Sequence, residues 1–131
     1  MVFPYTRYSS SVLRPVIEIG IKHRRRSLRY DVLVDSGADI DVFNVELAEA
    51  LGIELTAGGE AEVTGATGHV ETVSIHILTL TVGARTYKAP VAFLASANPY
   101  GLVGQRGFFD QFVVAFDLPH ERLEITPAPD L

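Results

Sequence analysis

Apolar and polar residues alternate along much of this chain with the two-residue period of β-strands. Ile17, Ile19 and Ile21 alternate with polar or small residues, which predicts a half-buried strand. Residues 30–34 form a more continuous apolar run, as expected of a strand buried on both faces. The basic segment at 22–27 lies between the two runs and predicts a hairpin connection.

A second group of predicted strands begins around Thr64–Gly68, a turn sequence with two glycines available for positive φ. Apolar positions predict long strand arms on both sides of this turn. Their phase shifts near Leu78, which predicts a bulge or a bend. Further short strands are predicted at residues 87–94, 102–104, 113–116 and 122–125.

Helical signals are few. Residues 44–52 carry a candidate N-cap in Asn44 and a candidate end in Gly52. The aromatic spacing at residues 108–112 fits a second short helix. Together these patterns predict a mainly β domain, closed or sandwiched, with one or two short helices.

Length and composition narrow the class of protein. The 131 residues suit one domain, which we place at residues 15–131, preceded by a weakly patterned N-terminal arm at residues 1–14. A formal net charge of −5 counts against general nucleic-acid binding. The absence of cysteine excludes disulfides, zinc ribbons and cysteine nucleophiles. We expect a cytoplasmic protein without a membrane contact, because the chain has neither a long apolar run nor a basic, apolar leader.

The candidate chemistry lies where the apolar run at 32–34 continues into Asp35, Ser36, Gly37 and Ala38. A carboxylate at the end of a buried strand costs several kcal/mol unless it is hydrogen-bonded or shares a proton. Taken alone, Asp-Ser-Gly also fits an Asx turn or a helix cap. The unbroken apolar run before it favours a functional carboxylate, as do the predicted helix after it and the later Leu102-Val103-Gly104 run.

In the order and spacing of these segments the chain resembles the retropepsin-like aspartic peptidases, the family of the retroviral proteases and their single-domain cellular and bacterial relatives. The resemblance covers about residues 15–126. Asp35–Ala38 matches the family's catalytic Asp-Ser/Thr-Gly-Ala, and Thr64–Gly68 matches the tip of its flap. Leu102–Gly104 matches the strand beneath the catalytic loop, and the stretch from Phe108 to Asp117 looks like bacterial members.

This resemblance implies a closed, β-barrel-like acid-protease domain that acts as an aspartic endopeptidase without a cofactor or a metal. Peptide hydrolysis by this route needs two carboxylates at one water, one ionised to accept a proton and one protonated to donate. The chain contains Asp-Ser-Gly once. The chemistry therefore requires a homodimer with a two-fold axis, in which each chain supplies Asp35.

The resemblance also implies supporting roles for the other matched residues. Ser36, Gly37 and Ala38 would stiffen and complete the catalytic loop, and the strand beneath it would consist of Leu102, Val103 and Gly104. An extended peptide or unfolded protein substrate would contact Asp39 and the flap tip, Gly65, Ala66, Thr67 and Gly68. Because Ala38 cannot donate a hydrogen bond to the catalytic carboxylate, we expect a pH optimum nearer ~5–6 than in pepsin-like enzymes.

One departure concerns the dimer. Retroviral enzymes place an arginine directly after the apolar-apolar-Gly run, whereas this chain has Gln105 there and Arg106 next. The arginine–aspartate contact that steadies the dimer is therefore expected to differ.

Two other functions stay open at this point. One is a non-catalytic dimeric β-domain that binds extended peptides or scaffolds a partner. The other, less favoured, is a nucleic-acid module built on the basic run at Lys22–Arg26. Metal binding by His69 and His76, or by the aspartates at 35, 39 and 41, is weakly supported because the ligand spacing of known sites is missing.

Overall fold

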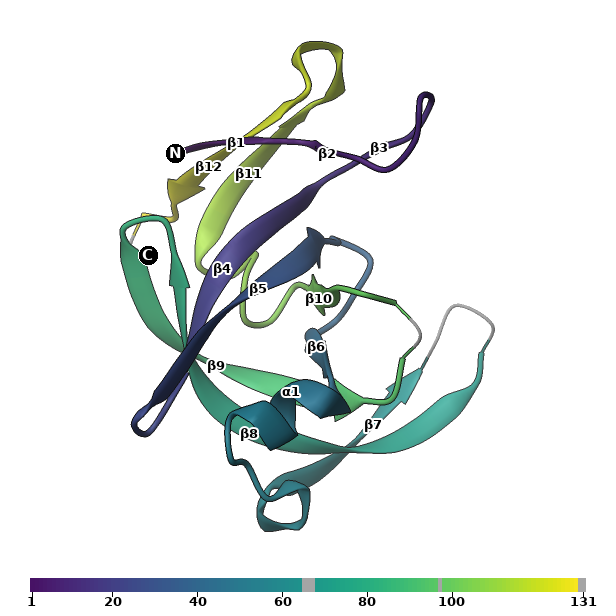
Figure 1. The fold of residues 1–131 in the computed structure, drawn as a ribbon, viewed down its shortest axis with the longest axis vertical. Helices are drawn as coiled ribbons and strands as arrows, with labels where there is room; N and C mark the ends of the chain where they lie inside the picture. The colour runs from purple at the N-terminus through teal and green to yellow at the C-terminus, as the bar shows by residue number, and fades with distance from the viewer. Residues whose placement is uncertain (65–67, 97, 130–131) are drawn as a thin grey trace.

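The fold is taken from a computed structural model that describes residues 1–64, 68–96 and 98–129. It is mainly β with short helices, which confirms the predicted class (Figure 1). The strands are β1 (Val2–Pro4), β2 (Thr6–Arg7), β3 (Leu13–Arg14), β4 (Val16–His23), β5 (Arg26–Val34), β6 (Asp41–Asn44), β7 (Gly59–Thr64), β8 (Val70–Val82), β9 (Arg85–Leu94), β10 (Gly101–Val103), β11 (Phe112–Asp117) and β12 (Arg122–Pro127). The helices are α1 (Val45–Ala50) and the 3-10 turns η1 (Leu55–Ala57) and η2 (Leu118–His120).

The largest sheet has the order β4-β5-β10-β6-β9-β8-β7. Its strand β8 also pairs with β4, so the strands from β4 round to β8 close into a ring and β7 stays at an edge. Short β10 pairs in parallel with the end of β5, which places Val103 beside Val34. The hydrophobic core fills the ring, where Val32, Leu80 and Val91 are fully buried.

The hairpin predicted from alternating isoleucines is present as β4 and β5. Ile17, Ile19 and Ile21 are at most 3% exposed, because the period-2 pattern turns all three to the core. The chain reverses at Arg24, whose positive φ of 55° is the left-handed conformation that a tight hairpin requires. The basic residues of this turn therefore lie at the exposed end of a hairpin.

The phase shift near Leu78 is a bend. The register between β8 and β9 is unbroken from Ser74 opposite Phe93 to Val82 opposite Arg85, so no bulge residue is inserted in this pairing. Figure 1 shows β8 as one long curved strand. Its two halves bury opposite faces, since Val73 is buried in the first half and Leu78, Leu80 and Val82 in the second. The first half pairs with β7 and the second half with β4.

The two predicted helices have different outcomes. Helix α1 forms within residues 44–52, where the Asn44 side chain accepts a hydrogen bond from the Glu46 N–H at 3.1 Å. The helix predicted over residues 108–112 is wrong, because this stretch is a series of turns that follows Gly107 at a φ of 105°. Its aromatic spacing reflects burial instead, since Phe108 and Phe112 lie in the core.

The first 14 residues are more ordered than their weak pattern predicts. β1 pairs with β12 in a three-stranded sheet of order β1-β12-β11, and β2 pairs with β3. The Met1 ammonium donates to the Ile125 carbonyl at 2.8 Å. These residues therefore take part in two sheets, while the division of the chain into an arm at residues 1–14 and a domain at residues 15–131 stays a prediction.

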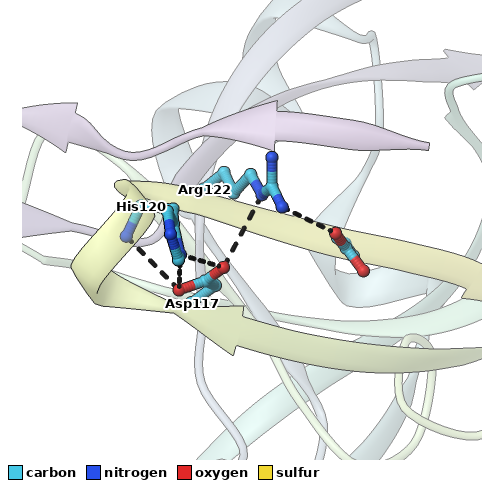
Figure 2. A network of polar contacts seen from close by, with 4 residues as sticks. Asp117, His120 and Arg122 are labelled. Atoms are coloured by element: carbon cyan, nitrogen blue, oxygen red, sulfur yellow. Dashed lines mark hydrogen bonds and ion pairs between the residues drawn. The ribbon is translucent and has the colours of Figure 1, made fainter.

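The turn between β11 and β12 holds a small polar network (Figure 2). Asp117 caps η2 by accepting from the His120 N–H, and its carboxylate also contacts the His120 ring and, at 3.6 Å, Arg122. The hydrogen bond from His120 lowers the pKa of Asp117. Such exposed contacts define the shape of the turn more than they stabilise the fold.

No helix in the described ranges is long and apolar enough to cross a membrane.

Candidate active site

The loop that follows β5 is held directly on β10. The Asp35 N–H donates to the Val103 carbonyl at 3.0 Å, and the Gln105 N–H donates to the Ala38 carbonyl at 2.8 Å. Within the loop the Ala38 N–H donates to the Asp35 carbonyl at 3.1 Å, which closes a tight turn. One end of the four-residue loop is therefore fixed to buried β10, and the other to Gln105, two residues beyond its end.

The Asp35 carboxylate lies half-buried at the start of this turn. Its Oδ1 accepts a hydrogen bond from the Gly37 N–H at 2.9 Å. This is the geometry of an Asx turn, so the structural interpretation of Asp-Ser-Gly describes the local backbone correctly. Whether the carboxylate also has a chemical role depends on what it faces.

Asp35 lines a cleft of about 590 Å³ that lies between the Asp35–Ala38 loop and strand β7 of the β7–β8 hairpin. Gly37, Ala38, Asp39 and Leu102 line it too, so the cleft brings together many of the residues predicted from the sequence. The remaining lining residues are Ile40, Val42, Glu62, Val63, Thr64 and Leu94.

Some predicted site residues lie elsewhere. Ser36 is exposed and does not line the cleft, while Val103 and Gly104 are buried beneath the loop, as a supporting strand requires. Gly68 has a φ of 81° in the connection between β7 and β8, away from the cleft lining. Gly65, Ala66 and Thr67 fall outside the described residues.

The cleft combines apolar walls with an acidic lining. Its larger apolar residues come from β6, β7, β9 and β10 and, in Ile40, from the loop before β6. Its carboxylates are Asp35, Asp39 and Glu62. No lysine, arginine or histidine is among its described lining residues. A concave apolar site with a few convergent polar groups suits an extended peptide with apolar side chains.

Comparison with known families identifies the family of the chain that carries this cleft. Residues 23–106, more than half of the chain, match the family model described as aspartyl protease. The chain belongs to the aspartyl protease family. It is accordingly an aspartic endopeptidase, a hydrolase of peptide bonds, as the sequence resemblance implied. A search of curated proteins finds no match.

Solved structures place this aspartyl protease in the retropepsin-like fold. A retropepsin-like aspartic protease from Rickettsia conorii superimposes with a TM-score of 0.67 at 15% identity, over 95% of this chain and 88% of the other. The EIAV protease, solved in complex with the inhibitor HBY-793, superimposes with a TM-score of 0.51 at 20% identity, over 76% of this chain and 88% of the other. At these identities the likeness concerns the fold.

The protease replaces the arginine of retroviral enzymes with a different set of contacts. The Gln105 side chain donates to the Ser36 carbonyl at 2.7 Å, which adds an exposed hydrogen bond to the Asp35–Ala38 loop. The Arg106 N–H donates to the Asp39 carbonyl at 3.0 Å. Arg106 forms no ion pair with any residue in the described ranges, so its role within one protomer rests on its backbone.

Gly104 explains why glycine follows the apolar pair of β10. A side chain there would collide with the carbonyl of Ala38, because the loop lies directly against the Gly104 backbone. Glycine is thus required by close packing of two backbones. Any larger residue would push the loop that carries Asp35 off its supporting strand.

Sequence reasoning missed one residue of this region, Asp41. The aspartate pattern offered it only as a weak calcium ligand, yet it is the one ionisable residue of the Asp, Glu, Lys or Arg type in the described structure that is fully buried. Burial raises the pKa of Asp41 to about 8. The sequence carried a signal for its burial but not for its partner, because Asp41 lies two residues before Phe43 on a strand and therefore shares its inward face.

Proposed function

We propose that this aspartyl protease works as a homodimer, in which one Asp35 carboxylate from each protomer activates a water molecule between them. The observation that carries the proposal is the position of Asp35, half-buried in the lining of the cleft on a loop that is hydrogen-bonded at both ends. Asp-Ser-Gly occurs once in the chain, so one protomer supplies half of the required carboxylate pair.

The reaction follows from two carboxylates at one site. They cannot both ionise when they lie close together, so they share a proton. The ionised member accepts a proton from water as the water attacks the scissile carbonyl, and the protonated member donates to that carbonyl oxygen. Collapse of the tetrahedral species then breaks the C–N bond, as the carboxyl that accepted the water proton passes it to the leaving amine and the other carboxylate takes a proton back from the diol hydroxyl.

The substrate class we propose is an extended peptide or an unfolded protein. The β7–β8 hairpin would act as a flap, with the tip at 65–68 closing over the substrate, which binds as an added strand. Asp39 at the cleft would contact the substrate main chain. Ser36 would stiffen the loop across the dimer axis, and Gly37 would let the substrate backbone approach.

The test is cleavage of an unfolded polypeptide between pH 4 and 7, with and without pepstatin. We expect wild-type cleavage that pepstatin inhibits, with an optimum nearer pH ~5–6. Asp35→Asn should abolish cleavage, because an amide cannot cycle a proton with water. The matched control is Asp31→Asn, an exposed position on β5, the strand that leads into Asp35, and outside the cleft, which should cleave like wild type.

Dimerisation has its own measurement. Specific activity should fall on dilution in step with the loss of dimer in analytical ultracentrifugation. Adding excess Asp35→Asn chains to wild type should lower activity further, because mixed dimers contain one carboxylate. Cleavage by a species that stays monomeric, or equal cleavage by wild type and Asp35→Asn, contradicts the proposal. Binding of peptide without cleavage would favour the scaffolding alternative.

A further inference from the structure

The carboxyl of Asp41 has no role in the mechanism above. It starts β6 with 0% exposure and lies outside the cleft lining, on the inner side of the loop. Its Oδ1 accepts one hydrogen bond, from the Gly104 N–H at 2.9 Å. Its Oδ2 has no hydrogen-bond partner in the described part of the chain. An ionised carboxylate that is buried and held by a single hydrogen bond is costly, so burial favours the neutral acid.

The contact with Gly104 falls between the two bonds that anchor the catalytic loop. The carbonyl of Val103 accepts from the Asp35 N–H, and the N–H of Gln105 donates to the Ala38 carbonyl. Gly104 stands between these two residues, and its N–H is held by Asp41. Three successive residues under the loop are thus bonded in turn to its start, to Asp41 and to its end.

The surrounding backbone is shaped around this carboxyl. A side chain on Gly107 would collide with the Asp41 carboxyl, and Gly107 has a φ of 105° that favours glycine. Asp110 accepts from the Gly107 N–H at 3.1 Å, and Tyr87 on β9 donates to the Gly107 carbonyl at 2.8 Å. Gly107, in the turn after β10, therefore packs against the Asp41 carboxyl and is held there by hydrogen bonds to Asp110 and Tyr87.

The charge shown to act on Asp41 is that of Asp110, and it favours the neutral acid. Asp110 on the turn repels a negative charge there, and a charge on Asp41 would in turn oppose ionisation of Tyr87. Arg85 on β9 acts on Tyr87, and no cation in the described ranges forms an ion pair with Asp41. Burial raises the pKa of Asp41 to about 8 in agreement with this setting.

We propose that Asp41, as a neutral carboxylic acid, is a positioning residue that holds the Gly104 peptide and thereby fixes both anchoring points of the loop carrying Asp35. This inference rests on the proposed role of Asp35. Asp41 touches neither substrate nor the reacting atoms. It acts through the geometry of the strand beneath the loop.

The kinetic test compares Asp41→Asn with Asp41→Ala in the full chain at pH 5–6. The asparagine keeps an acceptor for the Gly104 N–H without a titratable proton, so kcat should stay within about threefold of wild type. The alanine removes the acceptor, so kcat should fall about tenfold or more while KM changes little, because a small misplacement of reacting groups is expensive. The matched control for lost core packing is Val82→Ala, a fully buried position on β8 outside the site.

These variants decide the proposal in either direction. A kcat for Asp41→Ala no lower than that of Val82→Ala overturns it, as does an asparagine variant that fails to restore kcat. A kcat that is retained in Asp41→Asn and falls in Asp41→Ala below that of Val82→Ala supports it.

A second measurement does not depend on activity and separates this proposal from the proposed function. Amide hydrogen exchange at Gly104 should be slow in wild type and Asp41→Asn, and fast in Asp41→Ala. Above about pH 8, wild type should lose protection beyond the intrinsic pH effect, while Asp41→Asn should not. Equal Gly104 protection in all three proteins overturns the positioning role, even if the wild type proves inactive for another reason.

Discussion

At the scale of single residues, glycines at close backbone contacts and the buried Asp41 shape the site around Asp35. Gly104 and Gly107 permit contacts that any side chain would block. The Asp-Ser-Gly-Ala segment and the glycine of the supporting strand could be found from the sequence, because their residue types are distinctive. Asp41 could not be assigned that way, since its meaning depends on Gly104, which lies 63 positions along the chain.

Gly104→Ala is expected to destabilise the protein by about 1–3 kcal/mol, because the added methyl meets the backbone of Ala38. Urea unfolding measures this as a lower transition midpoint. The control is Gly59→Ala, where no atom lies within 4 Å of the added methyl. It should change stability by less than about 1 kcal/mol. A neutral Gly104→Ala would show that the loop is not packed on β10 as described.

At the scale of elements, alternating patterns located strands better than helices. β4 was predicted from its period-2 apolar face and β5 from a more continuous apolar run, and apolar positions also located β8 and β9. The false helix at 108–112 arose because core aromatics at spacings of three and four mimic helical periodicity. β1 was missed because its short pattern becomes meaningful only beside β12, at the other end of the chain.

The edge strand β7 should contribute to substrate selection through Glu62. This carboxylate lines the same cleft as Asp39, so a basic side chain in the substrate would be attracted there. Glu62→Gln should lower the ratio of kcat/KM for a lysine-containing peptide to that for its glutamine analogue. The loss should correspond to about 0.2–1 kcal/mol of transition-state binding, which is the range of exposed ion pairs. Glu60→Gln, two positions earlier on β7 but outside the cleft lining, should leave this ratio unchanged. Equal effects of both variants would rule out a specific contact.

At the scale of the whole molecule, the two ends of the chain are joined in one sheet that stands beside the ring of strands (Figure 1). Strand β12 lies between β1 and β11, so the N-terminal residues cover one of its edges. Phe3 of β1 is partly buried and packs against the core. The first strand thus belongs to the folded unit energetically.

Phe3→Ala should therefore lower the free energy of unfolding by about 1–3 kcal/mol, because much of an aromatic side chain leaves the core. Chemical denaturation measures the loss. Val2→Ala, at a position 63% exposed on the same strand, is the matched control and should cost less than about 0.5 kcal/mol. Similar small losses for both would mean that β1 is only loosely attached.

The buried acid of β6 also makes folding a proton-coupled reaction. In the unfolded chain Asp41 ionises with its ordinary pKa of 3.8, whereas in the folded protein the pKa is about 8. The stability associated with this group is fully present below pH 3.8 and is lost as the pH rises through 8, because the folded state binds the extra proton. Refolding near pH 7 should therefore take up about one proton per chain. Calorimetry in buffers of different ionisation enthalpy would count that proton, and Asp41→Asn should remove it.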